Sequence, residues 1–593
     1  MTSMLCDSQN RINGRRDELF SSSSASLRWD SEVFVLRGDN RAELRQRVQA
    51  LVDFLARTPS VELKDLAFTL NTTLAPGGSR LAVVAESVAD LQSLLGRAAQ
   101  RLSDPRCQLI KETRGSYFFE QPLGPRSKLA ILFPGEGSQY LNMLADLLPH
   151  FPEVREHFAR CDLLSVRNGG GPEPISKRIF VPPSLSDGER AAAEKELWRL
   201  GNAVSSILIS EWALYLLLCE LGLRPDMVGG HSAGEFSALL AAGCIEPDDF
   251  FIEQLFALSR VLQGQEDDGS LAEVCLLAVA AGRSVVEEIL GSEADVVVAM
   301  DNCPHQTVTA CSPALAGAAQ ERLSARGIVC ERLPFRRPYH TPLFEPFLGP
   351  IAAMYERLHV RPPRLALYSC TTGRPFPTDV ADIRRLAVSH WASPVEFIRL
   401  AKAMYADGAR LFVECGPRGN LTSFVQDILR GQSFEAVAVN SVHRSGLTQL
   451  NHLAALLAAH HVELRFEHLY KQRNPQEIAW EAKTPSSASL TRGEGSLSPS
   501  PLVGEGERHG SRHCHAAIFR RHGAIPRPGA GNDGGISGTS LRCCRASVAC
   551  LALAWRDHSS RTGTPAGPAS AHGHTRRPVR GRSHAGRPRS QCR

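Results

Sequence analysis

The stretch "GHSAGEF" places one serine, Ser232, between small residues directly after a short apolar run. A serine on a sharp turn between a strand and a helix exposes its hydroxyl, and small neighbours relieve the crowding at such a turn. The N-terminus of the following helix also helps to hold negative charge that develops on a substrate oxygen. The pattern predicts a nucleophilic serine, although such strings also occur by chance in Gly- and Ala-rich sequence.

A serine nucleophile needs a base that takes its proton. His340 is the strongest candidate of the 20 histidines, because it follows the last strand of a predicted subdomain and heads the loop "HTPLFEP". A single loop histidine is more often a surface residue than a catalyst. The residue pattern alone therefore leaves both interpretations of His340 open.

The segments around Ser232 follow an α/β order. A buried-strand pattern, "LAILF", ends in the loop Gly135 to Gln139, and open α/β folds bind ligands at that end of their strands. The apolar stretch Asn202 to Leu223 carries Glu211 and Glu220, which favours a buried helix over a membrane span. Strand, serine and helix then follow in the order that a nucleophile elbow requires.

Two further units flank these segments. Residues 272–335 predict the order β-α-β-β-α-β, which is typical of a ferredoxin-like subdomain inserted into the larger sheet. Residues 30–105 alternate strand and helix patterns and predict a small α/β linker domain. The fold class is therefore α/β: a hydrolase-like parallel-sheet domain with an inserted subdomain, preceded by a small linker domain.

The net charge of +5 conceals two different regions. Residues 484–593 contain 17 Arg, no Lys and five acidic residues, a net charge of +12, so the rest of the chain carries −7. This tail has two aromatic residues and no sustained apolar period, which predicts disorder. Arginines attract phosphates, but Arg without Lys in a low-complexity context also suits GC-rich DNA translated outside its selected frame. We favour this second interpretation and expect no nucleic-acid partner.

The remaining composition is that of an ordinary intracellular protein. The first 29 residues lack the apolar core of a secretory signal and predict a disordered leader. The 16 cysteines are scattered, without paired C-x-x-C spacing, which indicates reduced thiols and a cytoplasmic location. We expect no membrane association and no bound metal.

Several ordered motifs resemble the acyltransferase domains of type I polyketide and fatty acid synthases and the malonyl-CoA:acyl carrier protein transacylases. The motifs are "FPGEGSQ", "GHSAGEFSALLAAG", "NCPHQTVTAC", "YHTPLFEP", "YSCTTGRPFP", "SHWASPVEF" and "ECGPRGNLT". The resemblance implies an acyltransferase domain over residues 125–445 and a following segment over 446–475. It also implies that residues 30–105 are the linker that follows a ketosynthase in such synthases.

The resemblance assigns a role to each matching residue. Ser232 is the acyl-accepting nucleophile and His340 the general base and acid, with the N–H groups of Ala233 and Glu136 forming the oxyanion hole. The family holds its histidine with a backbone carbonyl, so no triad Asp is required. Acyl-CoA is the donor, an acyl carrier protein is the acceptor, and no cofactor is bound. Because no ketosynthase, reductase or carrier-protein motif is found, the chain is expected to work with a ketosynthase or other synthase subunits, or to be a fragment of a larger synthase.

The acyl group is where the sequence departs from this family. Malonyl-type members carry an arginine that pairs with the free carboxylate, and here that position falls on Ala257, with Arg260 as the nearest substitute. The four residues Arg337 to His340 match neither the common malonyl nor the common methylmalonyl version of their motif. Glu136 replaces the usual Gln and is expected to repel a malonyl carboxylate, while Tyr339 is expected to crowd a branched α-carbon. These differences predict an unbranched acyl group without a free carboxylate, unless Arg260 binds one.

Two alternatives remain at this level. A serine esterase or thioesterase shares the elbow, but it predicts an acidic triad residue and no ferredoxin-like insertion. An inactive docking module of a synthase requires neither Ser232 nor His340.

Overall fold

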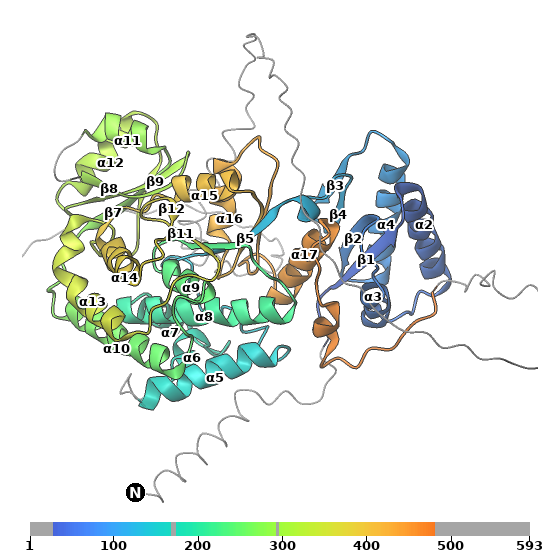
Figure 1. Ribbon diagram of the computed structural model, residues 1–593, viewed down its shortest axis with the longest axis horizontal. Helices are drawn as coiled ribbons and strands as arrows, with labels where there is room; N and C mark the ends of the chain where they lie inside the picture. Colours follow the sequence, from blue (N-terminus) through green and yellow to red (C-terminus); the bar gives the residue numbers. More distant parts are fainter. Residues whose placement is uncertain (1–27, 168–173, 292–295, 481–593) are drawn as a thin grey trace, which may run out of the picture.

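The structure is a computed structural model that describes residues 28–167, 174–291 and 296–480. Figure 1 shows two lobes, a larger α/β lobe and a smaller one, with helix α17 (Gly446–Ala459) beside the sheet of the smaller lobe. The predicted leader (1–29) and the predicted Arg-rich tail (484–593) fall outside the described residues, apart from residues 28 and 29.

The smaller lobe is built on an antiparallel sheet in the order β1-β2-β4-β3. Its elements are β1 (Glu32–Gly38), α2 (Arg41–Arg57), α3 (Leu63–Thr72), β2 (Ser79–Ala85), α4 (Val88–Ser103), β3 (Leu109–Glu112) and β4 (Ser116–Phe119). The side chain of Asn40 accepts a hydrogen bond from the Glu43 N–H and so caps α2. The predicted boundary at residue 105 is too early, because β3 and β4 complete this sheet.

The larger lobe contains a sheet in the order β12-β11-β6-β5-β13-β14, which is parallel except for β12. Its strands are β5 (Lys128–Phe133), β6 (Met227–Gly230), β11 (Ala366–Ser369), β12 (Arg374–Pro375), β13 (Ala409–Glu414) and β14 (Glu435–Ala438). The carboxyl ends of the central strands β5 and β6 lie side by side, which brings the loops that follow them together.

Helices cover both faces of this sheet (Figure 1). The α-helices are α5 (Pro152–Arg167), α6 (Ser176–Ile179), α7 (Asp187–Leu197), α8 (Leu200–Glu220), α9 (Gly234–Ala241), α10 (Asp249–Asp267), α13 (Leu348–Arg357), α14 (Val380–Ser389), α15 (Phe397–Ala406) and α16 (Asn420–Ile428). Short 3₁₀ turns are η1 (Gly124–Arg126), η2 (Pro342–Phe347), η3 (His390–Ala392) and η4 (Phe466–Tyr470).

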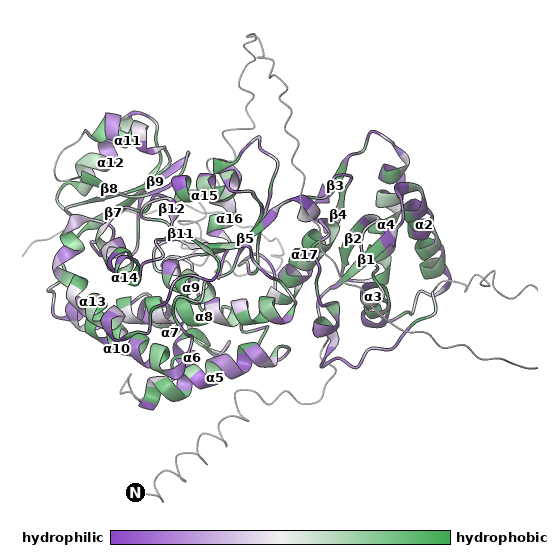
Figure 2. Cartoon of the chain, in the orientation of Figure 1, coloured by the Kyte–Doolittle hydropathy of each residue, from purple (hydrophilic) through white to green (hydrophobic). Residues whose placement is uncertain are grey.

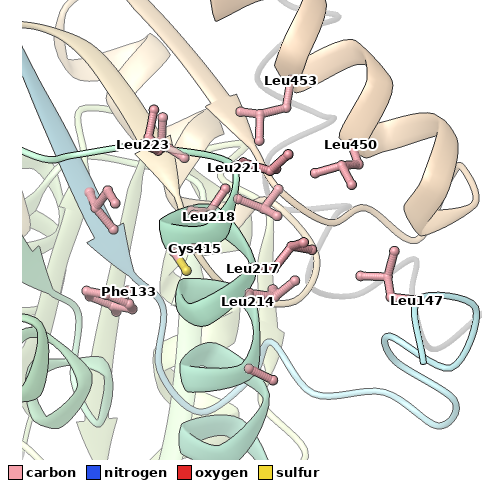
Figure 3. Close-up of a cluster of buried hydrophobic side chains, with 14 of the residues drawn as sticks. Phe133, Leu147, Leu214, Leu217, Leu218, Leu221, Leu223, Cys415, Leu450 and Leu453 are labelled. Carbon is pink, nitrogen blue, oxygen red and sulfur yellow. The ribbon is translucent and has the colours of Figure 1, made fainter. Parts of the chain in front are cut away.

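Helix α8 is strongly apolar, and much of its ribbon is green in Figure 2. Among the described residues it alone is long and apolar enough to cross a membrane, but 83% of its apolar window is buried inside the protein. In Figure 3 its C-terminal leucines meet Phe133 of β5 on one side and Leu450 and Leu453 of α17 on the other. Helix α8 is therefore a core helix that links the two lobes.

The inserted subdomain has the strand order β10-β7-β9-β8 and is antiparallel throughout. Its elements are β7 (Cys275–Val279), α11 (Arg283–Leu290), β8 (Val296–Cys303), β9 (Gln306–Cys311), α12 (Ala316–Ala325) and β10 (Cys330–Arg332). This is the ferredoxin-like arrangement that the sequence predicts. The Asp301 N–H donates to the carbonyl of Val395, which fixes β8 against the larger lobe.

Candidate active site

Ser232 occupies a tight turn between β6 and α9, with a backbone φ of 53°. Residues other than glycine seldom adopt this left-handed backbone conformation, and residues strained in this way are concentrated at functional sites. The turn closes because its neighbours are glycines: a Cβ on Gly234 would lie 2.2 Å from the carbonyl oxygens of Phe133 and Pro134, and one on Gly230 would lie 2.3 Å from the Glu235 nitrogen. The predicted elbow geometry is therefore present at Ser232.

His340 lies directly opposite Ser232, although 108 residues separate them in the chain. The Oγ of Ser232 is 2.7 Å from the Nε2 of His340, within hydrogen-bond distance. Ser232 is 5% exposed and His340 is fully buried, so water has little access to this contact. His340 also has a positive φ, 59°, and follows the inserted subdomain in the chain, as the sequence predicts.

The second ring nitrogen of His340 faces backbone carbonyls. Its Nδ1 lies 3.2 Å from the carbonyl oxygen of His390 and 3.1 Å from that of Ser393. Because a carbonyl only accepts, Nδ1 must carry the proton, and Nε2 is left as the acceptor for the Ser232 hydroxyl. The tautomer is thus fixed without an acidic side chain, the arrangement that a base for Ser232 needs.

Burial and, to a smaller extent, the nearby His231 lower the pKa of His340 to about 4. The imidazole is therefore neutral at physiological pH and free to accept a proton. His231 itself is held by the inserted subdomain, since its Nε2 is 2.8 Å from the Oδ1 of Asn302. Asn302 in turn donates to the side-chain carbonyl of Gln306.

The backbone N–H of Ala233 follows Ser232 and that of Glu136 follows Gly135, and neither donates to another group within the described part of the chain. The loop that follows β5 packs closely against the turn at Ser232 because Gly135 has no side chain. A Cβ at Gly135 would lie 2.9 Å from the Ser232 Cβ. The guanidinium of Arg418 donates to the carbonyls of Ser138 and Gln139 and holds the same loop. The pair of N–H groups has the composition of an oxyanion hole.

The Glu136 carboxylate is not an isolated charge, in contrast to what the sequence suggests. It forms an ion pair with Arg337, and both side chains are 4% exposed. Arg337 also pairs with Glu266, 2.7 Å away, and donates to the carbonyl of Trp198. Burial raises the pKa of Glu136, against the lowering effect of Arg337. The repulsion expected from Glu136 is therefore partly offset, although two acids and one base still leave this cluster with a net charge of −1.

The two residues predicted to contact the acyl group lie in different environments, one buried and one exposed. Tyr339 is buried next to His340, with its ring packed against Phe344 and Trp391. Arg260 is exposed on α10, and it forms no ion pair or hydrogen bond with any residue that the structure describes. Its neighbour Ser259 is buried, whereas the Arg260 side chain is exposed, so the role of Arg260 as a carboxylate-binding residue stays a prediction.

A second cluster lies directly behind Ser232 and His340. Glu235, Cys370 and His390 are all buried, and their ligand-type atoms lie within 4.8 Å of one another. It is the one group of three potential metal ligands in the described residues.

The comparisons with known proteins agree with this geometry. The family described as "Acyl transferase domain" matches residues 131–464, more than half of the chain. The chain belongs to the acyl transferase family. Residues 32–95, in the smaller lobe, match the family described as "CurL-like, PKS C-terminal".

Relatives and solved structures place this acyl transferase among synthases. It is 25% identical over 382 residues to one component of a polyunsaturated fatty acid synthase of Thraustochytrium sp., covering 63% of this chain and 13% of that protein. It is 29% identical over 350 residues to a phenolphthiocerol synthesis polyketide synthase of Mycobacterium marinum, covering 58% and 16%. The acyltransferase domain of the second salinomycin polyketide synthase module is 26% identical with a TM-score of 0.54, covering 74% of this chain and 94% of that domain. The chain thus spans less than a fifth of the length of the first two relatives.

Sequence reasoning missed the groups that complete the site through space. Asn302 and His390 lie inside the motifs "NCPHQTVTAC" and "SHWASPVEF", yet no local pattern tells which ring or carbonyl they meet. Arg337 departs visibly from the family motif, but its pairing with Glu136 joins residues 201 positions apart. The signal that identifies these residues is the burial of their polar side chains, and burial can be recognised only once the fold is known.

Proposed function

We propose that this acyl transferase moves an acyl group from acyl-CoA to the phosphopantetheine thiol of an acyl carrier protein, through an ester on Ser232, in cytoplasmic polyketide or fatty acid biosynthesis. The observation that carries the proposal is the 2.7 Å contact between the Ser232 Oγ and the His340 Nε2 in a member of this family. Synthase subunits, a ketosynthase among them, are the expected partners.

In the first half-reaction the Ser232 Oγ attacks the thioester carbonyl while the Nε2 of His340 takes the hydroxyl proton. The oxygen that becomes negative would accept hydrogen bonds from the N–H groups of Ala233 and Glu136. When the C–S bond breaks, the CoA sulfur leaves with the proton that His340 held. The products are an acyl ester on Ser232 and free CoA.

The second half-reaction runs the same steps in reverse with a different thiol. The carrier thiol gives its proton to His340 and attacks the ester, and Ser232 leaves with that proton. Because CoA has left before the carrier thiol reacts, the kinetics are expected to be ping-pong.

The test is incubation of the protein with a panel of radiolabelled acyl-CoAs, followed by mapping of the label and addition of a phosphopantetheinylated carrier protein. Label is expected on Ser232 and then on the carrier. Ser232→Ala should abolish labelling without unfolding the protein, whereas Ser312→Ala, which alters an exposed serine, should label normally. Labelling that persists in Ser232→Ala would contradict the assignment of the nucleophile.

The same assay separates the alternative functions. Release of labelled free acid without transfer to the carrier would indicate a serine esterase or thioesterase. No labelling by any donor would leave an inactive docking module.

We further propose that malonyl is a poor donor and that an unbranched acyl group without a free carboxylate is preferred. The family's carboxylate-binding position is Ala257, and Arg260 is exposed on α10. Arg337 is already engaged by Glu136, Glu266 and the Trp198 carbonyl, in a cluster with net negative charge. A further buried carboxylate beside it would be repelled. The bulk of Tyr339 is expected to disfavour branched acyl groups.

Values of kcat/KM for acetyl-CoA, longer acyl-CoAs, malonyl-CoA and methylmalonyl-CoA test this preference. Glu136→Gln removes one negative charge and frees part of the Arg337 guanidinium, so it should raise malonyl transfer relative to acetyl. Arg260→Ala is the matched control and should change neither malonyl transfer nor acetyl transfer. A strong malonyl preference that collapses in Arg260→Ala would overturn the proposal and identify Arg260 as the carboxylate-binding residue.

A further inference from the structure

Glu235, Cys370 and His390 come from three segments that hold the active site in place. Glu235 lies in the first turn of α9, three residues after Ser232. Cys370 directly follows β11, and His390 begins η3 and supplies one of the carbonyls that face His340. Each residue is at most 3% exposed, so the cluster is part of the interior.

The distances between the three ligand-type atoms suit a small metal ion. The Nδ1 of His390 lies 3.7 Å from the Sγ of Cys370 and 3.9 Å from the Oε1 of Glu235, and all three atoms lie within 4.8 Å of one another. A point equidistant from three atoms so placed lies roughly 2.2–2.5 Å from each, close to the lengths of Zn–S, Zn–N and Zn–O bonds. The protein therefore holds a thiol, an imidazole and a carboxylate at nearly the separation that zinc requires.

Two polar atoms of this cluster lack a hydrogen-bond partner, while the Nδ1 of His390 also lies 3.4 Å from the Oγ1 of Thr371. The Oε1 of Glu235 and the Nε2 of His390 have no hydrogen-bond partner among the described residues. The second Glu235 oxygen, Oε2, accepts from the Cys370 N–H, which orients the carboxylate so that Oε1 faces His390. A buried polar atom without a partner is costly, and no Lys or Arg in the described part of the chain pairs with Glu235.

Charge and donor type favour a divalent transition cation. A thiolate and a carboxylate together carry −2, which balances Zn²⁺, and a neutral imidazole completes three protein ligands. Burial raises the pKa of the Cys370 thiol well above its usual value, so the thiolate forms only when an ion binds. Binding must release the Cys370 proton, so affinity should increase with pH.

In contrast to the expectation from sequence of no bound metal, we propose that Glu235, Cys370 and His390 form a zinc-binding site behind the catalytic pair. The ion does not take part in acyl transfer. It would join the elbow helix α9, the end of β11 and η3, the three segments that set the positions of Ser232 and His340. The ring of His390 is 5.2 Å from that of His340, so occupation of the site would stabilise the geometry of the pair.

The test uses the full chain, stripped with a chelator and then titrated to equilibrium with Zn²⁺ or Co²⁺. Cys370→Ser is compared with Cys161→Ser, a buried cysteine 3.6 Å from the Nε2 of His157 that belongs to no three-ligand group in the described residues. We expect zinc to raise the melting temperature and Co²⁺ to give a thiolate charge-transfer band, in the wild type and in Cys161→Ser. Cys370→Ser should lose the band and at least about 100-fold in zinc affinity, more than an outer-shell partner usually contributes.

Glu235→Gln provides a second variant in case Cys370→Ser fails to fold; it should retain the charge-transfer band but bind zinc more weakly. Further His and Cys residues beyond residue 480 can also bind zinc, so the decisive measurement is the comparison between variants. Equal zinc affinity and equal cobalt spectra in Cys370→Ser and Cys161→Ser would overturn the proposal. So would the absence of both zinc stabilisation and the cobalt band in the wild type.

Discussion

At the scale of single residues, the environment of His340 makes a prediction about pH. Burial and the nearby His231 lower the pKa of His340 to about 4, and the neutral ring is the form that accepts the Ser232 proton. The base is therefore lost only as the pH falls through about 4. We expect the single-turnover rate of Ser232 acylation by acetyl-CoA to change less than about twofold between pH 8 and pH 5.5.

An imidazole with an ordinary pKa would lose about tenfold in rate over the same range. Rapid quenching with labelled acetyl-CoA measures this rate, His340→Ala gives the background, and circular dichroism verifies that the protein remains folded. A tenfold loss with a midpoint near 6.5 would contradict the buried, neutral base.

Ser232 could be predicted from a local motif whose residue types carry the chemistry, whereas His340 was assigned only through the family resemblance. Glu136 was also found, but its charge was misjudged, since its partner Arg337 is 201 positions away and no local pattern joins them. The exposure of Arg260 could not be predicted, for a different reason. A helical register says which positions share a face, but which face is buried depends on the neighbouring helix.

At the scale of elements, the elbow depends on the absence of a side chain at Gly234. A Cβ there would lie 2.2 Å from two backbone carbonyl oxygens, which cannot rotate away. Gly234→Ala is expected to lower the free energy of unfolding by about 2–3 kcal/mol and to abolish acylation. Gly264→Ala in α10, where a Cβ meets nothing within 4 Å, should leave activity intact and stabilise by up to about 1 kcal/mol. Thermal unfolding and acylation assays that rank the two variants equally would contradict this account.

Helix α8 carries a buried acid whose ionisation opposes folding. Burial raises the pKa of Glu211 well above its usual value, although the Ser237 hydroxyl donates to its Oε2 at 2.6 Å. A carboxyl with a raised folded pKa stabilises the protein below its unfolded pKa, and this contribution is lost as the pH rises toward the folded pKa. Glu211→Gln should therefore raise the melting temperature at pH 8, with a smaller gain at pH 5.

The control for this prediction is Glu220→Gln in the same helix, where the side chain is 48% exposed and no gain is expected. Melting temperatures of both variants and the wild type across the pH range give the comparison. A difference between Glu211→Gln and wild type that does not change with pH would show that Glu211 ionises as readily in the folded state as in the unfolded state.

Most elements could be predicted because their patterns are long. Strands β7 and β8 and the core helix α8 follow from apolar runs of five or more residues. Strands β3 and β4 were missed, since each has four residues and β3 alternates only weakly between buried and exposed positions. They form by pairing with each other and with β2, a contact that no short window contains.

At the scale of the whole molecule, the segment after the acyltransferase sheet holds both lobes together. Thirteen of the fourteen residues of α17 are buried. Its His452 Nδ1 lies 2.7 Å from the Tyr117 hydroxyl of β4, and Arg473 forms a buried ion pair with Glu32 of β1. On the other side, leucines of α17 meet the end of α8 (Figure 3). The predicted segment 446–475 is therefore part of the core of both lobes rather than a separate unit.

Removing α17 should lower the free energy of unfolding by more than either lobe can lose and still remain folded. Five leucines of α17 are buried, and at about 2 kcal/mol for each side chain their exposure costs on the order of 10 kcal/mol, comparable with the entire stability of a typical domain. A chain ending at residue 445 is expected to aggregate, because the sheet of the smaller lobe and the end of α8 would lose their apolar cover. A chain ending at residue 480 keeps every described contact and should remain monodisperse with wild-type acylation. Size-exclusion chromatography, thermal unfolding and Ser232 labelling compare the two chains, and a folded, active chain ending at residue 445 would show that α17 is dispensable for the core.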